Sequence, residues 1–127
     1  MPSMVRVDPR RARGAAHASA LHDLPDADLV ALMAASDARQ VFDTVCSTCH
    51  GMDGKGHGPA SANLNPKPRN YTDKQWQSSV TDDQIAKTIL LGGAAVGKSP
   101  VMPAQPQLRD KPEVVAELVR IVRGFGK

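Results

Sequence analysis

The sequence predicts an all-α protein of three to four helices joined by long loops. Apolar residues recur at spacings of three and four in each candidate helix, and no stretch shows the alternation of a half-buried strand. Glycines and prolines interrupt residues 51–70, which excludes long regular structure there. Aromatic residues make up only 3% of the 127 residues, which is thin for a core built from side chains alone. A large buried cofactor would fill such a core.

The first segment, residues 1–35, is predicted to be an arm that contains one short helix. Residues 1–25 show no sustained apolar period, so we expect their order to depend on docking to a partner. A helix over residues 27–35 follows Asp26, which is a plausible N-cap.

The remaining residues, 36–127, are enough for one domain with its own core. The first helix of this domain is predicted to begin at Ser36 as N-cap and to run to Cys46. One face of the helix is apolar and must pack against other elements. That face consists of Ala38, Val41, Phe42 and Val45.

Two further helices have clear start signals. Thr81 and Gln84 have the spacing of a capping box, and Gly92-Gly93 would end the helix that follows. Asp110 is the expected N-cap of the last helix. The last helix has a broad apolar face made of Val114, Val115, Leu118, Ile121, Val122 and Phe125.

The charge distribution argues against nucleic acid as a partner. Residues 1–20 carry four arginines and one aspartate, residues 21–36 carry three aspartates, and the formal charge of +3 therefore belongs to the rest of the chain. This excess is small, and no basic stripe with interleaved aromatic residues is present. No run approaches the roughly 18 apolar residues that a membrane-spanning helix needs.

The strongest motif is Cys46-Ser47-Thr48-Cys49-His50. The C-x-x-C-H spacing is typical of covalent haem c attachment. Two intervening residues let each thiol add to one haem vinyl group, and the next residue presents its imidazole to the iron as the proximal ligand. The sequence therefore predicts one covalently bound haem c.

Three other interpretations of the cysteine pair are weaker. A redox-active pair is expected at a helix N-terminus after a strand, whereas this pair follows a helix. A structural zinc site needs four ligands, and neither a second cysteine pair nor a histidine pair at the usual spacing lies near these cysteines in the sequence. An ordinary disulfide gives no reason for the adjacent His50.

A low-spin electron carrier needs a sixth ligand on the other face of the haem. Met102 is the best candidate, because two prolines stiffen the helix-free loop around its thioether. Met52 is too close to His50 in the chain to cross easily to that face, and Met33 fits the apolar face of its own helix. The bis-histidine alternatives are His57, His22 and His17.

With these features, residues 37–127 resemble the class I, monohaem cytochrome c family. In that family a small residue and an aromatic residue stand eight and four positions before the first cysteine, where this chain has Ala38 and Phe42. A Gly-rich loop that ends in a proline follows the histidine, here Gly51 to Pro59. The resemblance implies that the carbonyl of Pro59 accepts the Nδ1 proton of the proximal histidine.

The resemblance also assigns candidate residues to the haem propionates. Buried carboxylates need donors, and the preferred residues are Arg69 and Trp76, followed by Tyr71, with plain surface or packing roles as the alternative. The segment 99–103 matches the family's methionine loop, and the last helix is expected to cross the first. Two features depart from the family pattern: Ile121 replaces a frequent aromatic residue, and the arm has no counterpart.

The expected function is one-electron transfer between redox protein partners, without enzymatic activity. The chain would be a free shuttle or a subunit of a larger oxidoreductase, soluble or membrane-bound, docked through residues 1–35. The alternative is a haem enzyme or sensor with an open or bis-histidine iron site, which binds small molecules or acts as a peroxidase. The candidates for a weakly basic docking rim are Lys55, Lys98 and Lys67.

The expected location is the periplasm or an equivalent compartment, because covalent haem attachment takes place outside the cytoplasm. Arg10, Arg11 and Arg13 resemble the charged start of a secretion signal, but no apolar segment follows them. We therefore expect a signal that was cleaved or that belongs to a longer precursor.

Overall fold

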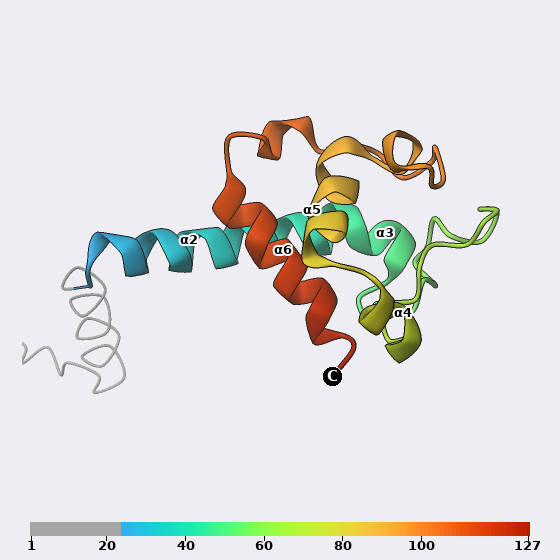
Figure 1. Ribbon diagram of the computed structural model, residues 1–127, viewed down its shortest axis with the longest axis horizontal. Coiled ribbons are helices and arrows are strands. Elements are labelled where there is room, and N and C mark those ends of the chain that lie inside the picture. Colours follow the sequence, from blue (N-terminus) through green and yellow to red (C-terminus); the bar gives the residue numbers. More distant parts are fainter. Residues whose placement is uncertain (1–23) are drawn as a thin grey trace, which may run out of the picture. The chain divides into compact units, whose positions relative to one another are not determined.

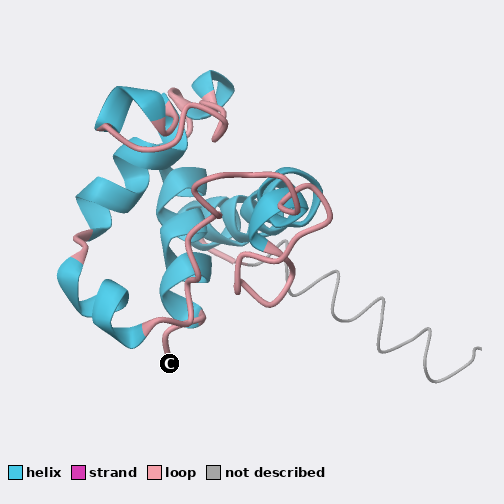
Figure 2. Cartoon of the chain, turned by 90° about the vertical axis from the view of Figure 1, so that its right-hand side faces the viewer, coloured by secondary structure: helices cyan, strands magenta, loops and turns pink. Residues whose placement is uncertain are grey.

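The computed structural model describes residues 24–127, and within that range the chain is helical, with loops and no strand (Figures 1 and 2). This confirms the predicted all-α class. Most of the predicted arm lies outside the described residues, so its docking role stays a prediction. The helices are α2 (Asp26–Val41), α3 (Ser47–His50), α4 (Lys74–Ser79), α5 (Asp82–Leu91) and α6 (Pro112–Gly124), with 3-10 turns at Ala94–Val96 and Pro106–Leu108.

The chain divides into two compact units, Met1–Leu32 and Met33–Lys127. The described part of the first unit is the start of α2, where the N–H groups of Asp28 and Leu29 donate to the carbonyl of Pro25 at 2.9 and 3.1 Å. The second unit contains the buried core and the described candidate site residues.

α2 is one continuous helix where the sequence predicts two. The expected helix start at Ser36 is wrong, because Ser36 is an exposed residue inside α2. No glycine or proline interrupts α2, and its many alanine and leucine residues have a high helix propensity that outweighs one serine. Asp26 likewise belongs to the first helical turn instead of capping it. The domain boundary between residues 35 and 36 stays a prediction.

A π-helical turn, Phe42–Cys46, joins α2 to α3. Its signature is the hydrogen bond from the Ser47 N–H to the carbonyl of Phe42, five residues earlier. The wider turn holds one residue more than an α-helical turn, so it changes the direction of the side chains that follow. Because α3 follows this turn directly, the helical run continues to His50, beyond its predicted end at Cys46.

α4 was not predicted, although the sequence contains its start signal. The carboxylate of Asp73 accepts hydrogen bonds from the N–H groups of Gln75 and Trp76 at 3.0 and 3.3 Å, as an N-cap does. The predicted capping box of α5 is confirmed, with Thr81 and Gln84 each accepting from the other's N–H group.

α6 begins one residue later than predicted. Its N-cap position is Lys111, and no side chain caps the helix there, so the expected cap at Asp110 is wrong. Pro112 opens the helix instead, because its fixed φ suits the first turn and its missing N–H would have no helical partner there.

The core forms where α6 packs against the C-terminal part of α2 and against α5. Figure 1 shows α6 crossing α2, as the resemblance implies, and the rings of Phe42 and Phe125 lie 5.5 Å apart. Ile121 is half-buried at the edge of this core. The buried residues of α6 are Val114, Val115, Leu118, Val119 and Val122.

Candidate functional site

The two cysteines and the histidine of the motif lie at the end of the helical run. Cys46 closes the π-helical turn, and Cys49 and His50 belong to α3. Both thiols are free and half-buried, and His50 is buried. Gly51 then ends α3 with a φ of 80°, a conformation that glycine adopts without strain. The local fold therefore presents two thiols and one imidazole within a single short segment.

The environment of the thiols does not suit a redox-active pair. Burial raises the pKa of Cys46 to about 11, and the nearby Cys49 adds to the shift. Cys46 is therefore protonated at neutral pH, whereas a redox-active cysteine needs a lowered pKa. Within residues 24–127 no three His, Cys, Asp or Glu side chains gather as a metal site, so a zinc site has no ligand set there.

The hydrogen bonds of His50 define its tautomer. Its Nδ1 lies 3.1 Å from the carbonyl oxygen of Arg69, and its Nε2 lies 3.1 Å from the hydroxyl of Tyr71. A carbonyl can only accept, so Nδ1 carries the proton and Nε2 presents its lone pair. This is the tautomer in which an imidazole binds a metal through Nε2.

Burial keeps this imidazole neutral. It lowers the pKa of His50, and the hydrogen bond to the Arg69 carbonyl opposes the shift in part. Burial also raises the pKa of Tyr71, so its hydroxyl stays protonated and can donate to Nε2. The two rings stack, with centroids 4.4 Å apart.

The structure gives Nδ1 another partner than the expected one, the carbonyl of Arg69 in place of that of Pro59, and a cofactor-binding role for Pro59 stays a prediction. The N–H groups of Gly58 and Ala60 donate to the carbonyls of Cys49 and Thr48, which holds the residues around Pro59 against α3. Pro59 there lines a surface pocket together with Ser47 and Thr48.

Segment 69–71 reaches His50 through two backbone hydrogen bonds. The N–H of Tyr71 donates to the carbonyl of Gly54 at 2.7 Å, and the N–H of Gly56 donates to the carbonyl of His50 at 2.8 Å. The Gly-rich loop is thereby folded between the histidine and the segment that contacts it. The bond between Tyr71 and Gly54 joins distant parts of the sequence, so no local signal predicts it.

The three propionate candidates lie together in one cluster of two aromatic rings and a guanidinium group. The guanidinium of Arg69 lies 5.7 Å from the ring centre of Trp76, and the rings of Trp76 and Tyr71 lie 5.5 Å apart. Arg69 is exposed, so its charge remains accessible. Tyr71 instead is buried and its hydroxyl contacts His50, which does not support the expected propionate contact. A propionate role for Arg69 and Trp76 stays a prediction.

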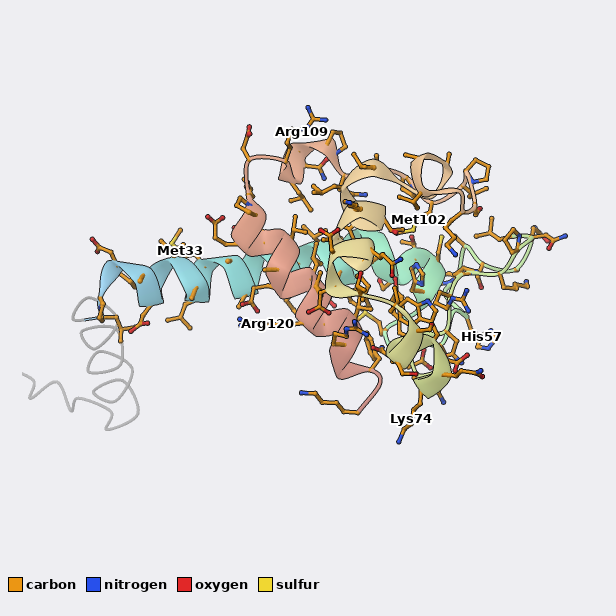
Figure 3. All side chains as sticks on the ribbon, in the orientation of Figure 1. Met33, His57, Lys74, Met102, Arg109 and Arg120 are labelled. Carbon is orange, nitrogen blue, oxygen red and sulfur yellow. The ribbon has the colours of Figure 1, made fainter. Side chains whose placement is uncertain are left out.

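Met102 is half-buried in the loop that follows α5 (Figure 3). Its carbonyl accepts a hydrogen bond from the N–H of Gly93 at 3.0 Å. Three residues later, the N–H of Gln105 donates to the carbonyls of Ile89 and Leu90 at 3.1 and 3.2 Å. The loop is therefore bound at Met102 by Gly93, just beyond the end of α5, and at Gln105 by the last turn of α5.

These residues fit a haem c group in their chemistry. Cys46 and Cys49 supply the two thiols, and the protonated Nδ1 of His50 leaves Nε2 for the iron. Ligation through Nε2 requires the hydroxyl of Tyr71 to leave this atom, because both would use the same lone pair. Two thiols and one imidazole in this arrangement are the attachment site of the class of proteins that bind haem c covalently and transfer electrons.

Comparison with known proteins places the chain in a family. The family model described as Cytochrome c matches residues 35–119, so the chain belongs to the cytochrome c family. A solved structure, the KustC0563 c-type cytochrome, is 31% identical and superposes with a TM-score of 0.51, covering 69% of this chain and 95% of that one. No curated protein matches.

Membership in the cytochrome c family indicates the general biochemistry of this chain. The family binds covalent haem c and transfers electrons, and its members are generally carriers rather than enzymes and typically extracytoplasmic. In residues 24–127, no helix is both long and apolar enough to cross a membrane.

Sequence reasoning missed a polar network beside the site. The amide nitrogen of Gln77 donates to the carbonyls of Tyr71 and Val122 at 2.8 and 2.9 Å. The guanidinium of Arg123 donates to both oxygens of Gln77, to the carbonyl of Val80 and to a carboxylate oxygen of Asp82. The network joins α6 to the segment that contacts His50. Only the position of Arg123 beside the apolar face of α6 could have indicated it.

Proposed function

We propose that this cytochrome is a one-electron carrier with His50 and Met102 as axial ligands. The observation that carries the proposal is the half-buried position of Met102 in a loop that is bound by Gly93 at Met102 and by the last turn of α5 at Gln105. Of the other described methionines, Met33 is 66% exposed and Met52 is 57% exposed. His57 is exposed as well, at the outer edge of its loop (Figure 3). His22 and His17 lie outside the described residues.

Each residue of the site has its own proposed role in binding the haem. When bound, haem c supplies one-electron exchange at its iron. Cys46 and Cys49 hold the group covalently. The carbonyl of Arg69 orients the imidazole of His50 and increases its basicity through the Nδ1 proton. Met102 contributes a thioether, a ligand that raises the reduction potential.

The first test is the absorption spectrum of the holoprotein, in the visible and near-infrared, oxidised and reduced. We expect the oxidised wild type to show a weak sulfur-to-iron band, which Met102→Ala abolishes while lowering the reduction potential. Met52→Ala, which removes the exposed methionine next to the motif, is the matched control and keeps the band.

A wild-type spectrum without the sulfur-to-iron band would contradict methionine ligation. It would favour the second candidate, an open or bis-histidine iron site that binds small molecules or acts as a peroxidase. Cyanide or carbon monoxide binding to the wild type would then distinguish the open site, which binds these ligands rapidly, from a six-coordinate one.

Redox proteins are the proposed partners, and lysines around the site are the proposed docking charges. Lys55 and Lys98 are exposed, which supports this role. Lys67 is a weaker candidate, because its ammonium donates to the carbonyls of Ser61 and Ala62 at 3.0 and 2.8 Å and so holds its own loop. Interfaces of this kind are small and short-lived.

The proposed location is the periplasm or an equivalent compartment, which the typical location of the family supports. The proposed context is either a free shuttle or a subunit of a larger oxidoreductase. The arm, residues 1–35, is the proposed docking element in the second case.

A further inference from the structure

Gly93 lies under the loop that carries Met102. Its N–H donates to the carbonyl of Met102 at 3.0 Å, and its carbonyl accepts from the N–H of Lys98 at 2.7 Å. Both backbone groups of this one residue therefore bind the loop. The loop leaves the end of α5 at Gly93 and returns to the same residue at Met102.

Glycine is needed at position 93 because there is no room for a side chain, and not because of the backbone conformation. Its φ of −64° and ψ of −42° are helical, so any L-residue could adopt them. A Cβ atom at this position, however, would lie far inside the 3.0 Å that real Cβ contacts keep from the carbonyl oxygen of Ser99. The carbonyl of Ser99 occupies the space that every other residue would fill.

The neighbouring Gly92 extends the same close approach. A Cβ there would lie 2.9 Å from the nitrogen of Ala104 and 3.1 Å from the carbonyl oxygen of Met102. The backbone on both sides of Met102 thus rests directly on the two glycines that end α5. A loop in such contact with a helix end has little freedom to move away or to settle elsewhere.

We propose that Gly93 is a positioning residue for Met102: by bringing the backbone of Ser99 and Met102 onto the end of α5, it sets the place from which the thioether reaches the iron. The inference rests on the proposed His50 and Met102 ligation. Gly93 itself touches neither haem nor iron in this proposal and acts only through the loop.

The test compares Gly93→Ala with Gly124→Ala in the holoprotein. Gly124 is also a helical glycine, but nothing lies within 4 Å of a Cβ placed there. We expect Gly93→Ala to lose or weaken the sulfur-to-iron band, to lower the reduction potential and to bind added imidazole about tenfold more tightly, because a displaced Met102 competes less well for the iron. Gly124→Ala should behave as the wild type does.

The outcomes distinguish this inference from the proposed His50 and Met102 ligation on which it rests. A wild type without the sulfur-to-iron band would overturn the ligation, and the inference with it. A wild type with the band and a Gly93→Ala variant with unchanged band, potential and imidazole affinity would overturn the inference alone. Loss of the band together with higher imidazole affinity in Gly93→Ala would support it, since a merely structural role leaves the affinity for imidazole unchanged.

Hydrogen exchange of the wild-type holoprotein decides the matter if Gly93→Ala does not fold. The N–H of Gly93 should be protected from exchange, and the protection should be lost when imidazole displaces Met102, while the amide of Ile89 within α5 stays protected. A Gly93 amide whose exchange does not respond to the displacement of Met102 would overturn the proposal.

Discussion

At the scale of single residues, Phe42 connects the helical run that carries the cysteines to the C-terminal helix. It is 1% exposed, and its ring lies 5.5 Å from that of Phe125. The same helical run ends in His50 eight residues later. The place of the imidazole therefore depends on how well Phe42 is packed.

Replacement of Phe42 tests this dependence. We expect Phe42→Ala to lower the free energy of unfolding by about 3–5 kcal/mol, because it leaves a cavity in the core. Val45→Ala is the control on the same turn, since Val45 is 37% exposed, and its effect should be under about 1 kcal/mol. Urea denaturation of the holoproteins measures both, and equal effects would place Phe42 outside the core that holds the site.

At the scale of elements, Arg123 fastens α6 to the connection between α4 and α5. Its guanidinium binds Gln77, Val80 and Asp82, and its side chain is only 28% exposed. Arg120, three residues earlier on α6 (Figure 3), is 76% exposed and pairs only with Glu117 among the described residues. The two arginines therefore form a matched pair.

Arg123→Met should lower the free energy of unfolding by about 2–4 kcal/mol, since it leaves the carbonyls of Gln77 and Val80 without their charged donor. Arg120→Met should change it by less, about 1 kcal/mol or below, because Arg120 is 76% exposed, although its partner Glu117 is only 19% exposed. Thermal and urea unfolding of both variants measure the difference. Equal values would show that the network contributes no more than a surface pair.

At the scale of the whole molecule, the arm separates the two proposed contexts. Removal of residues 1–24 takes away most of the arm and leaves Pro25, whose carbonyl accepts the first hydrogen bonds of α2. If the arm docks the protein, the full-length chain should elute from extracts of its source cells with a larger assembly and the truncated chain should elute alone. Ascorbate should reduce both equally. Elution of both as free proteins would favour the shuttle.

The fold and the site were predictable to different degrees, for physical reasons. The attachment motif and the capping box of α5 depend on residues within a few positions of each other, so their spacing alone indicates them. The continuity of α2 depends on the sum of many weak helix propensities. One serine, Ser36, which resembles an N-cap, does not outweigh that sum. The pairing of Arg69 with His50 joins residues 19 positions apart, and it depends on how the intervening loop folds.

The π-helical turn Phe42–Cys46 fixes the direction in which the attachment motif faces. If the same residues wound as an α-helix, the motif would rotate by about 100° around the helix axis relative to the core, which is the turn of one residue. Both cysteines and the imidazole would then face another side. Loss of one residue from the turn would restore α-helical winding and leave the motif facing nearly the same way, because the turn holds one residue more than an α-helical turn. Functional relatives should therefore either keep the π-helical turn or lack one residue of it, and longer insertions should be found instead in the stretch 62–67.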